Sequence, residues 1–352
     1  MAGSSSRRPA TMSDVAKRAG VSITTVSHVV NRTRPVAPAT TELVLDAASQ
    51  LGYVSGDLLR SLGTTGLKTI GLAMSAISNV YLGDVVHSIE ATLSEAGYSL
   101  LLADTHDESA GEVQAVTELL RRYVDAVILA PVGDTSRILG YAEKRGVPIV
   151  VIDRPASADV DQVTAESVEP TAQLVDHLAD LGHSRIAMIS GRKGLTTTTE
   201  RIEGYRLGLR RSKLALHRAL QLDGDSTAQG GARAMHRLMA LGSPPAAVVV
   251  ANNNMTIGAL RAAKEIGVRI PEDVALVCFD DFEWADLFHP GLTAIAQPTD
   301  TMGVQAADLV LSRLAHPELP SRNVRLKSTF VHRESCGCTT SSMTTTTVAH
   351  AL

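Results

Sequence analysis

The sequence predicts a small all-α domain followed by an α/β core of two doubly wound parallel sheets. Residues 11–53 contain three short segments with helical spacing of apolar residues and no convincing strand. From Lys68 onward, apolar runs of strand length alternate with longer amphipathic segments. These runs form two consecutive sets, which indicates two sheets with ligand sites at the carboxyl ends of their strands. A chain of 352 residues that is 44% hydrophobic is long enough for both units.

The first unit has the pattern of a helix-turn-helix. Thr11 or Ser13 can cap the first helix, and Gly20 ends it. Ser22 can cap the second helix, and Pro38 suits the first turn of the third. Two short helices separated by a glycine turn make this motif. Because isolated helices under about 12 residues are marginal in water, the three helices must share one small core.

The core is predicted from buried-type runs and from the helical segments between them. Strands of the first set are expected at 68–75, 98–104, 125–131 and 147–153, and those of the second at 184–190, 246–252 and 273–280. Helices are expected near 81–96, 109–122, 134–145, 167–181, 200–212, 227–241 and 254–266.

Charge is distributed unevenly along the chain. The whole sequence has a formal net charge of -4, but residues 1–68 carry +4 and the remainder carries -8. A positive potential confined to the amino end favours contact with phosphates there. The two arginines near the start are not followed by an apolar run, and no stretch approaches a membrane span. We therefore expect no membrane partner and a cytoplasmic location.

The three cysteines, Cys278, Cys336 and Cys338, favour a reducing compartment over a disulfide framework. Cys336 and Cys338 are separated by one residue near the end of the chain. His332 is the only other close candidate ligand, whereas a metal ion would need more nitrogen or sulfur donors. Neither a metal nor another cofactor is predicted.

The segment ATMSDVAKRAGVSITTVSHVVNRTRPVAPAT resembles the DNA-binding headpiece of the lac repressor and galactose repressor (LacI/GalR) family. Its VSITTVSHVVN stretch looks particularly like the purine-repressor branch of that family. The likeness continues through NVYLGDVVHSIEATLSEAGYSLLLADT, VPIVVIDR, LGHSRIAMISG, ERIEGYRLGL, IPEDVALVCFDDF and LTAIAQP. It covers roughly residues 11 to 335.

This resemblance implies a homodimeric repressor with a periplasmic-binding-protein-like core, whose grip on pseudo-palindromic double-stranded operator DNA is modulated by a small-molecule effector. In such proteins the chain crosses three times between two subdomains that close on the effector. The expected boundaries are disordered ends at 1–10 and 339–352, a helix-turn-helix domain at 11–54, a hinge helix and linker at 55–67, and a core at 68–338. The N-subdomain is expected near 69–161 and 291–320, and the C-subdomain near 162–290 and 321–338.

The resemblance implies that Ile23, Thr24 and His28 of the second helix face the major groove. Thr24 and His28 can hydrogen-bond to base edges or phosphates, whereas Ile23 offers an apolar contact such as with a thymine methyl group. The alternative is that the serine and threonine side chains are merely solvated or cap helices, and that His28 is an ordinary surface residue. The other positions expected at the DNA are Thr11, Ser22, Thr25, Ser27 and Asn31.

Residues 55–64, SGDLLRSLGT, stand in the place of the hinge helix. By resemblance Arg60 and Leu62 contact DNA, with Leu62 as a wedge in the minor groove. The alternative is that Leu62 is a leucine of the dimer core. Gly56 and Gly63 each cost roughly 0.5 to 1 kcal/mol relative to alanine within a helix. We therefore expect the hinge to fold only on operator DNA.

The resemblance also implies an effector pocket lined from both subdomains. Its carboxylates and amides can bind vicinal hydroxyls, and its arginine offers a fixed fork of donors. The expected effector is a sugar or a related polar metabolite. For Asp280 and Arg201 the alternative is an interdomain or structural ion pair. The matching positions are Asn79, Tyr81, Asp153, Arg201, Asn252, Asp280 and Trp284.

The pocket departs from the family pattern at several positions. Ser226 stands where an aromatic residue is common, which removes a stacking wall for a flat ring, so a purine ligand is not inferred. Trp284, the only tryptophan, either supplies that wall or packs against His289 and Pro290.

Two other functions are considered. A free-standing periplasmic sugar receptor would share the core but needs a signal peptide and lacks a helix-turn-helix. An enzyme would need a catalytic site, and the sequence has no G-x-G-x-x-G, P-loop, G-x-S-x-G or H-E-x-x-H pattern. The sequence therefore predicts a DNA-binding regulator and not an enzyme.

Overall fold

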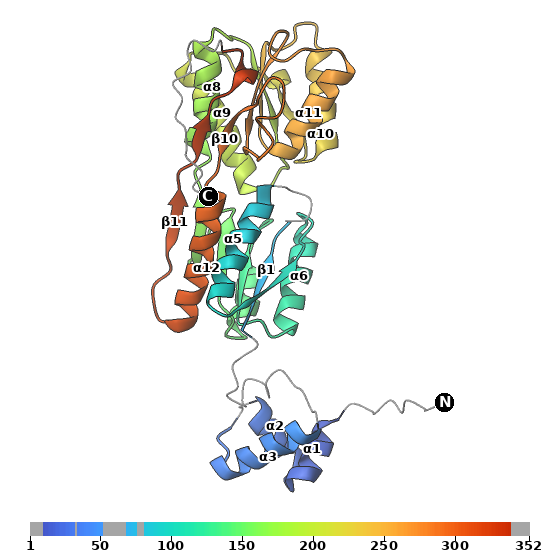
Figure 1. Cartoon of the computed structure of the whole chain (residues 1–352), viewed down its shortest axis with the longest axis vertical. Helices are drawn as coiled ribbons and strands as arrows, with labels where there is room; N and C mark the ends of the chain where they lie inside the picture. Colours follow the sequence, from blue (N-terminus) through green and yellow to red (C-terminus); the bar gives the residue numbers. More distant parts are fainter. Residues whose placement is uncertain (1–9, 32–33, 52–67, 76–80, 339–352) are drawn as a thin grey trace, which may run out of the picture.

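The computed structural model describes residues 10–31, 34–51, 68–75 and 81–338, without the side chains of Asn31, Ser49 and Tyr81. The first described unit, residues 11–51, is a three-helix headpiece (Figure 1). Its helices are α1 (Met12–Ala19), α2 (Ile23–Asn31) and α3 (Pro38–Leu51). The predicted all-α headpiece is therefore confirmed over these residues.

Local side-chain chemistry fixes where the first two helices begin. The Thr11 hydroxyl accepts from the Asp14 amide at 3.4 Å, and the Asp14 carboxylate accepts from the Thr11 amide at 2.8 Å, which is a capping box. Gly20 ends α1 with φ 68°, a left-handed conformation that glycine adopts without a steric penalty. The Ser22 hydroxyl then accepts from the Thr25 amide at 3.0 Å, at the start of α2.

The headpiece is held together by a small core to which each helix contributes branched or small side chains. Val15 of α1, Val26 of α2 and Val44 of α3 are completely buried. This shared burial compensates for the low intrinsic stability of such short helices. The remaining buried members of this core are Ala16, Val29, Val30, Ala47 and Ala48.

The first half of the core, here the N-half, is a six-stranded parallel sheet with the order β11-β5-β4-β3-β1-β2. Its strands are β1 (Thr69–Ala73), β2 (Ser99–Ala103), β3 (Ala126–Leu129), β4 (Ile149–Asp153), β5 (Asp161–Ala165) and β11 (Asn323–Leu326). Its helices are α5 (Tyr81–Glu95), α6 (Ser109–Arg121), α7 (Ser136–Glu143) and α12 (Thr299–Ala315).

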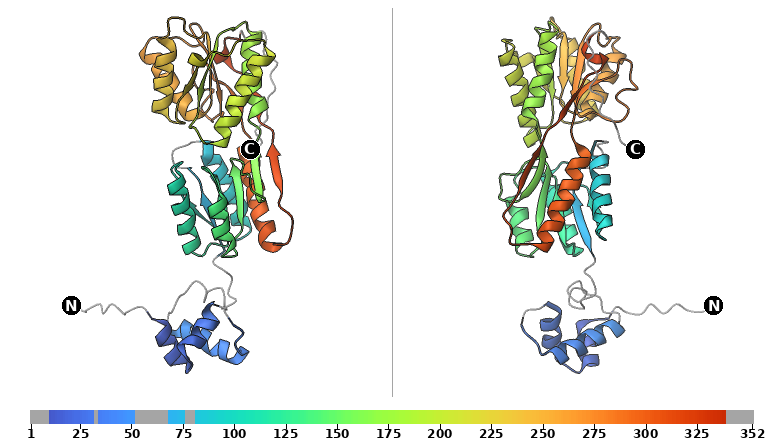
Figure 2. Two further views of the ribbon diagram at one scale, coloured as in Figure 1. Left: turned by 180° about the vertical axis from the view of Figure 1, so that it is seen from behind. Right: turned by 60° about the vertical axis from the view of Figure 1, so that its left-hand side comes forward.

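Helices cover both faces of this sheet, as a doubly wound fold requires. On one face α5 and α12 lie side by side (Figure 2), and Ile89 and Val310 are buried there against the sheet. On the other face α6 and α7 bury Leu119 and Ile138 in a second cluster. Both faces of the strands are therefore apolar, which explains their continuous hydrophobic runs.

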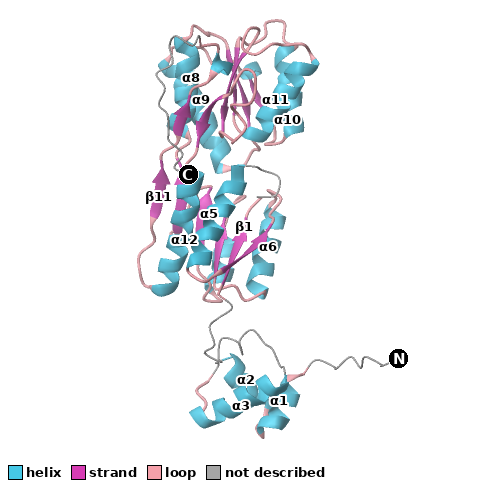
Figure 3. Cartoon of the chain, viewed as in Figure 1, coloured by secondary structure: helices cyan, strands magenta, loops and turns pink. Residues whose placement is uncertain are grey.

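The second half, here the C-half, has a six-stranded sheet with the order β12-β10-β9-β8-β6-β7, in which only the β10 and β12 pair is antiparallel. Figure 3 shows the same arrangement of strands between helices in both halves. Its strands are β6 (Ile186–Ser190), β7 (Gln221–Asp223), β8 (Ala247–Val250), β9 (Ala275–Phe279), β10 (Thr293–Ala296) and β12 (Thr329–Val331). Its helices are α8 (Val168–Asp180), α9 (Thr196–Arg211), α10 (Ala228–Met239), α11 (Asn253–Glu265) and the 3-10 helices η1 (Arg218–Leu220) and η2 (Glu334–Cys336).

The chain passes three times between the halves, after β5, after β10 and between β11 and β12. Three crossings were predicted, but the predicted boundaries put strands in the wrong halves. The boundary at 161–162 cuts through β5, which pairs with β4, and residues 291–320 begin with β10, which pairs with β9. β11 pairs with β5 in the N-half. The predicted boundaries were wrong because the chain leaves each half only after a strand that pairs within that half has ended.

Several predicted segments lie outside the described residues. They include the hinge at 55–67, the tail at 339–352, and the amino end at 1–10 apart from Ala10. Within the described ranges, none of the helices combines the length and the apolar character needed to cross a membrane.

Candidate functional site

Helix α2 of the headpiece has one buried face and one outward face. Val26, Val29 and Val30 are buried, whereas Ile23 is 53% exposed and Thr24 is exposed beside it. His28 lies one turn after Thr24, on the same side of the helix, and is partly exposed. Thr24 and His28 therefore share one face of the helix, as contact with a groove requires, and Ile23 is exposed at its first turn.

The other predicted headpiece residues surround the start of α2. Thr25 is partly exposed, and its hydroxyl lies 2.8 Å from that of Ser22. Ser27 is partly exposed on the helix. The caps formed by Thr11 and Ser22 use these side chains inside the headpiece, which agrees with the capping alternative for their hydroxyls. The side chain of Asn31 is not described.

A cleft with a volume of about 400 Å³ lies between the two halves of the core. Its lining comes from segments that follow the carboxyl ends of strands in both sheets, which is where doubly wound sheets bind ligands. The size suits a small metabolite. The polar side chains that line it include Asp107, Asp153, Arg154, Arg192, Arg201, Asp225, Ser226, Asn252, Asp280 and Gln297.

Asp153 and Asp280 occupy equivalent places in the two halves. Asp153 ends β4 and Asp280 follows β9, and each of these strands is third in its sheet. Both residues have left-handed backbones, with φ 66° and φ 72°. This conformation is unfavourable for a residue other than glycine and is often found at functional sites. Each sheet therefore directs one constrained aspartate toward the cleft.

Asp153 is a buried carboxylate beside a buried arginine. Arg154 Nε lies 3.6 Å from the Asp153 carboxylate, and Arg154 Nη1 lies 2.7 Å from that of Asp107. Burial raises the pKa of Asp153 above its usual value, although Arg154 and Arg201 act in the opposite direction. A hydroxyl that donates a hydrogen bond to this carboxylate would stabilise its charged form.

Arg201 of α9 and Asp280 form the corresponding pair in the C-half. Arg201 Nη2 lies 3.6 Å from Asp280 Oδ1, Nη1 donates to the Ala251 carbonyl at 2.5 Å, and the guanidinium lies 3.7 Å from the Phe279 ring centre. Gln297 lies where the chain makes its second crossing, after β10, and its side-chain amide donates to the Asp280 carboxylate at 2.6 Å. Among the described residues, no acceptor pairs with the buried Nε of Arg201. The alternative of an ion pair is therefore present, and it leaves one nitrogen of the guanidinium without a partner among the described residues.

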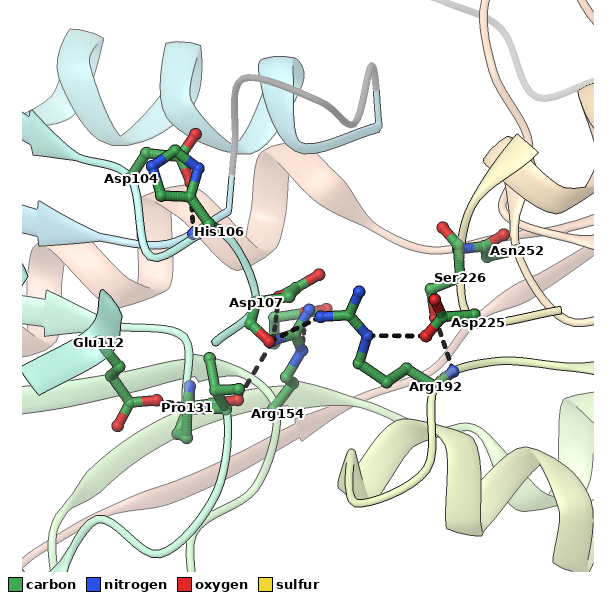
Figure 4. Close-up of polar contacts among 12 residues, drawn as sticks. Asp104, His106, Asp107, Glu112, Pro131, Arg154, Arg192, Asp225, Ser226 and Asn252 are labelled. Carbon is green, nitrogen blue, oxygen red and sulfur yellow. Dashed lines mark hydrogen bonds and ion pairs between the residues drawn. The ribbon is translucent and has the colours of Figure 1, made fainter. Parts of the chain in front are cut away.

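Arg192 joins the two halves directly. It follows β6 in the C-half, and its Nη1 donates to the main-chain oxygen of Asp107 in the N-half at 2.8 Å. On its own side, Nε lies 3.0 Å from Asp225, and its amide donates to the Ser226 hydroxyl at 2.9 Å. Figure 4 shows the Arg192 side chain extending between Asp107 and Asp225.

Comparison with known proteins identifies the family. Residues 11–55 match the model of bacterial regulatory proteins of the lacI family, and residues 175–336 match a periplasmic binding protein-like domain. The chain is 33% identical over 310 residues to the HTH-type transcriptional repressor PurR of Haemophilus influenzae strain PittEE, covering 88% of this chain and 92% of the relative. It is 33% identical over 329 residues to the ribose operon repressor of Escherichia coli K12, covering 93% and 99%. The chain belongs to the lacI family.

Solved structures support the same assignment for this lacI-family protein. A complex of the transcriptional regulator CelR with cellobiose has a TM-score of 0.71 at 30% identity, covering 93% of this chain and 99% of that one. A lac repressor dimer bound to operator has a TM-score of 0.70 at 28% identity, covering 94% and 99%. These relatives are transcriptional regulators and not enzymes, and this protein is an effector-modulated DNA-binding regulator.

The cleft of this lacI-family protein contains four of the predicted effector residues. Asp153, Arg201, Asn252 and Asp280 all line it. Asn252 also caps α11, because its side chain accepts from the Met255 amide at 2.8 Å. Their role toward an effector stays a prediction. The predicted positions Asn79, Arg60 and Leu62 lie outside the described residues, as does the side chain of Tyr81.

Trp284 does not line the cleft, which corrects the suggestion that it forms a wall of the effector pocket. Its ring packs against Phe282 at 4.5 Å and Phe288 at 5.6 Å between ring centres. It borders a separate apolar groove together with His289 and Pro290. Phe282, Trp284 and Phe288 thus contact one another, and none of them is among the residues that line the cleft.

Sequence reasoning missed the residues that complete the cleft. Asp107, Arg154, Arg192 and Asp225 were not proposed, although each lies in a segment that follows a strand. Their position after predicted strands was the available signal. Which of these polar loop residues enter the cleft depends on how the loops fold, and no periodicity encodes that.

Proposed function

We propose that this regulator is a homodimeric repressor that reads a pseudo-palindromic operator with α2. The observation that carries this proposal is the outward face of α2, where Thr24 is exposed and His28 lies one turn further on, while Val26, Val29 and Val30 are buried. Ile23, Thr24 and His28 contact base edges, and Thr25, Ser27 and Asn31 orient the helix on the phosphates. Arg60 and Leu62 in the hinge approach the minor groove.

We propose a sugar or a related polar metabolite as the effector. The described lining of the cleft carries several carboxylates and guanidinium groups but no phenyl, phenol or indole ring. Such groups bind vicinal hydroxyls well. The names of two similar proteins agree with this class, since one is a cellobiose complex and the other was solved with bound ribose.

An exposed apolar surface on the C-half supports a dimer. Leu287 is 75% exposed beside the groove that Ile257, Leu260, Trp284 and Phe288 line. A second copy of the chain that covers this surface would remove it from water and bring two headpieces together. Because DNA is the target, we place the protein in the cytoplasm.

The test of operator binding is a selection from random duplexes followed by gel-shift titration at several salt concentrations. We expect a pseudo-palindrome to be bound tightly by a dimer, with a steep salt dependence. A monomer that ignores every palindromic duplex at low ionic strength would overturn the proposal.

The effector class is tested by thermal shift with sugars, sugar acids, polyols and nucleobases. A ligand that binds only the folded protein raises its melting temperature. We expect a polyhydroxylated compound to do so and to change the affinity for the operator. A nucleobase that does both would contradict the effector class while leaving the DNA-binding proposal intact.

A further inference from the structure

Two histidines and two cysteines meet at one place in the C-half, outside the cleft. His177 lies in the last turn of α8, His332 follows β12, Cys336 ends η2, and Cys338 follows two residues later. One potential ligand atom from each residue lies within 4.8 Å of those of the other three. None of the three cysteines of the chain forms a disulfide.

The spacing of these atoms is close to that around a tetrahedral zinc ion. The Cys336 sulfur lies 3.3 Å from His332 Nε2, and the Cys338 sulfur lies 3.7 Å from His177 Nε2. Zinc bonds of about 2.3 Å to sulfur and about 2.0 to 2.1 Å to nitrogen place neighbouring sulfur and nitrogen ligands about 3.6 Å apart. The two close pairs bracket that value. The longest separation exceeds it by about 1 Å, which small side-chain rotations can remove.

The backbone holds the two cysteines in a geometry suited to a common partner. Gly337 between them has φ 88°, a left-handed conformation that lets the chain reverse its direction. The Ser335 hydroxyl donates to the Leu276 carbonyl at 2.6 Å and accepts from the Thr293 amide at 2.8 Å. Cys336 itself is fully buried. The turn that carries both sulfurs is therefore anchored to β9 and β10 before any ion binds.

We propose that His177, His332, Cys336 and Cys338 form a closed site for one zinc ion per chain. Two thiolates and two imidazoles are the donor set of many structural zinc sites, and they disfavour magnesium and calcium, which take oxygen ligands. Binding releases the two thiol protons to solvent, so that the ion is held by two thiolates and two neutral imidazoles. Since all four positions are filled by protein, the site is structural and not catalytic.

The position of the site defines what the ion would hold. β12 runs antiparallel to β10, so the turn after β12 lies at the edge of the sheet opposite the cleft. The ion would tie this last described segment of the chain to α8, the first helix of the C-half. Arg333, next to His332, pairs with Asp281 at 2.8 Å, and Asp281 follows Asp280 of the cleft. The site therefore secures the segment that carries Arg333, the partner of Asp281.

The sequence alone did not suggest this site, because the fourth ligand is far away along the chain. His332, Cys336 and Cys338 lie close together in sequence, whereas His177 is contributed by a helix that begins before β6. Only the folding of α8 against the β12 edge brings His177 to the cysteines, where its ring also contacts Phe330 at 5.2 Å between ring centres.

The test uses the full chain, purified reduced and free of metal, and titrated with Co²⁺ as a spectroscopic probe. We expect one Co²⁺ per chain, with a thiolate-to-cobalt charge-transfer band and the intense visible bands of tetrahedral coordination, both removed by Zn²⁺. Cys336→Ser and Cys338→Ser should each remove the part of the charge-transfer intensity that comes from one thiolate, and the double variant should remove all of it. His177→Gln should alter the visible bands and weaken Zn²⁺ binding at least tenfold.

The matched control is Cys278→Ala, which removes a buried thiol of β9 that is not part of the cluster and should retain the full cobalt spectrum. The proposal is overturned if the reduced wild type gives no thiolate band, or if the Cys336→Ser, Cys338→Ser double variant gives an unchanged one. A Cys336–Cys338 disulfide as the sole state of protein isolated under reducing conditions also overturns it.

A second measurement uses only the wild type, so that its result does not depend on whether a variant folds. Zn²⁺ should protect Cys336 and Cys338 of the wild type from alkylation, located by peptide mass mapping, and should raise the melting temperature. Alkylation of both cysteines at the same rate with and without Zn²⁺ contradicts the site.

Discussion

Arg192 donates from Nη1 to the main-chain oxygen of Asp107, 2.8 Å away on the opposite side of the cleft. The acceptor is a backbone atom, so its position depends on the loop after β2 and not on a side-chain rotamer. The same guanidinium pairs with Asp225 in its own half. One side chain thus contacts both walls of the cleft. Its removal should affect ligand binding more than folding.

For Arg192→Met we expect effector affinity to fall about tenfold, because the cleft loses a charge-assisted donor and a link between its walls. The loss of unfolding free energy should stay below about 1 kcal/mol, since the ion pair is partly exposed and screened by solvent. Calorimetric titration and chemical unfolding measure the two effects. Lys193→Met removes the neighbouring exposed charge, and an equal loss of affinity there would refute a specific role for Arg192.

For His28→Ala we expect a changed base preference at one or two positions of each operator half-site. A lost base-edge hydrogen bond costs about 1 to 3 kcal/mol against the preferred base and little against the others. Selection from randomised half-sites measures the preference. Lys17→Ala, which removes an exposed headpiece charge, should instead weaken all sequences alike and lower the salt slope. Uniform weakening by His28→Ala would show that it contacts only the backbone.

Asp153 should make the stability of the wild type fall as pH rises. Burial raises its pKa in the folded chain above the value in the unfolded chain. The folded state then binds the proton more tightly, so stability is lost as pH rises from the ordinary aspartate pKa through the raised folded pKa. Asp153→Asn should remove this contribution, as measured by the difference in unfolding free energy between variant and wild type across that window.

Asp134 provides a comparison of opposite sign. Hydrogen bonds from the amide and hydroxyl of Ser136 lower the pKa of Asp134. Its stabilising contribution is present above the ordinary aspartate pKa and is lost as pH falls through the lowered value. Asp134→Asn should therefore lose stability relative to wild type at neutral pH but not in acid. The same pH trend for both variants would contradict the two assigned causes.

For Leu287→Glu we expect a monomer at concentrations where the wild type is a dimer. A charge in the centre of an apolar interface must be desolvated without a partner, which costs several kcal/mol. Analytical ultracentrifugation measures the state, and operator binding should weaken with it. Leu216→Glu, at another exposed leucine, is the control and should leave association unchanged. A Leu287→Glu variant that stays dimeric excludes this surface as the interface.

Helices α10 and α11 meet at glycines, and this contact should tolerate no methyl group. A Cβ at Gly258 would lie 1.8 Å from the Ala228 carbonyl oxygen. Gly258→Ala should therefore cost more than about 2 kcal/mol through overpacking, despite the better helix propensity of alanine. Gly140→Ala in α7 meets nothing within 4 Å and should stabilise by about 0.5 to 1 kcal/mol. Thermal unfolding of the two variants with equal shifts would refute the steric argument.

The strands that the sequence predicted best are those whose residues form a continuous apolar run. The run from Ile149 to Asp153 is fully buried, and such runs can be read directly from apolar composition. β5 and β11 were not predicted, because Asp161, Thr164 and Arg325 interrupt the apolar pattern. Their strand conformation is specified by pairing with distant segments, which a local window does not contain.

The candidate site divides in the same way. Asp153 and Asp280 were predicted from the family resemblance, and both lie at the end of a recognisable buried strand, since Asp153 ends β4 and Asp280 follows β9. The contacts of Arg192 and the meeting of His177 with the two cysteines could not be predicted, since both depend on how far-separated loops and helices pack. The error in the predicted boundaries of the halves has the same origin, because the pairing of β10 with β9 depends on the tertiary fold and not on local sequence.

The threefold passage of the chain between the halves also limits how this architecture can evolve. Neither half corresponds to one continuous stretch of gene, so recombination at a single breakpoint cannot exchange one half for that of another regulator. A protease that cuts one connection would likewise leave the halves joined by the remaining two.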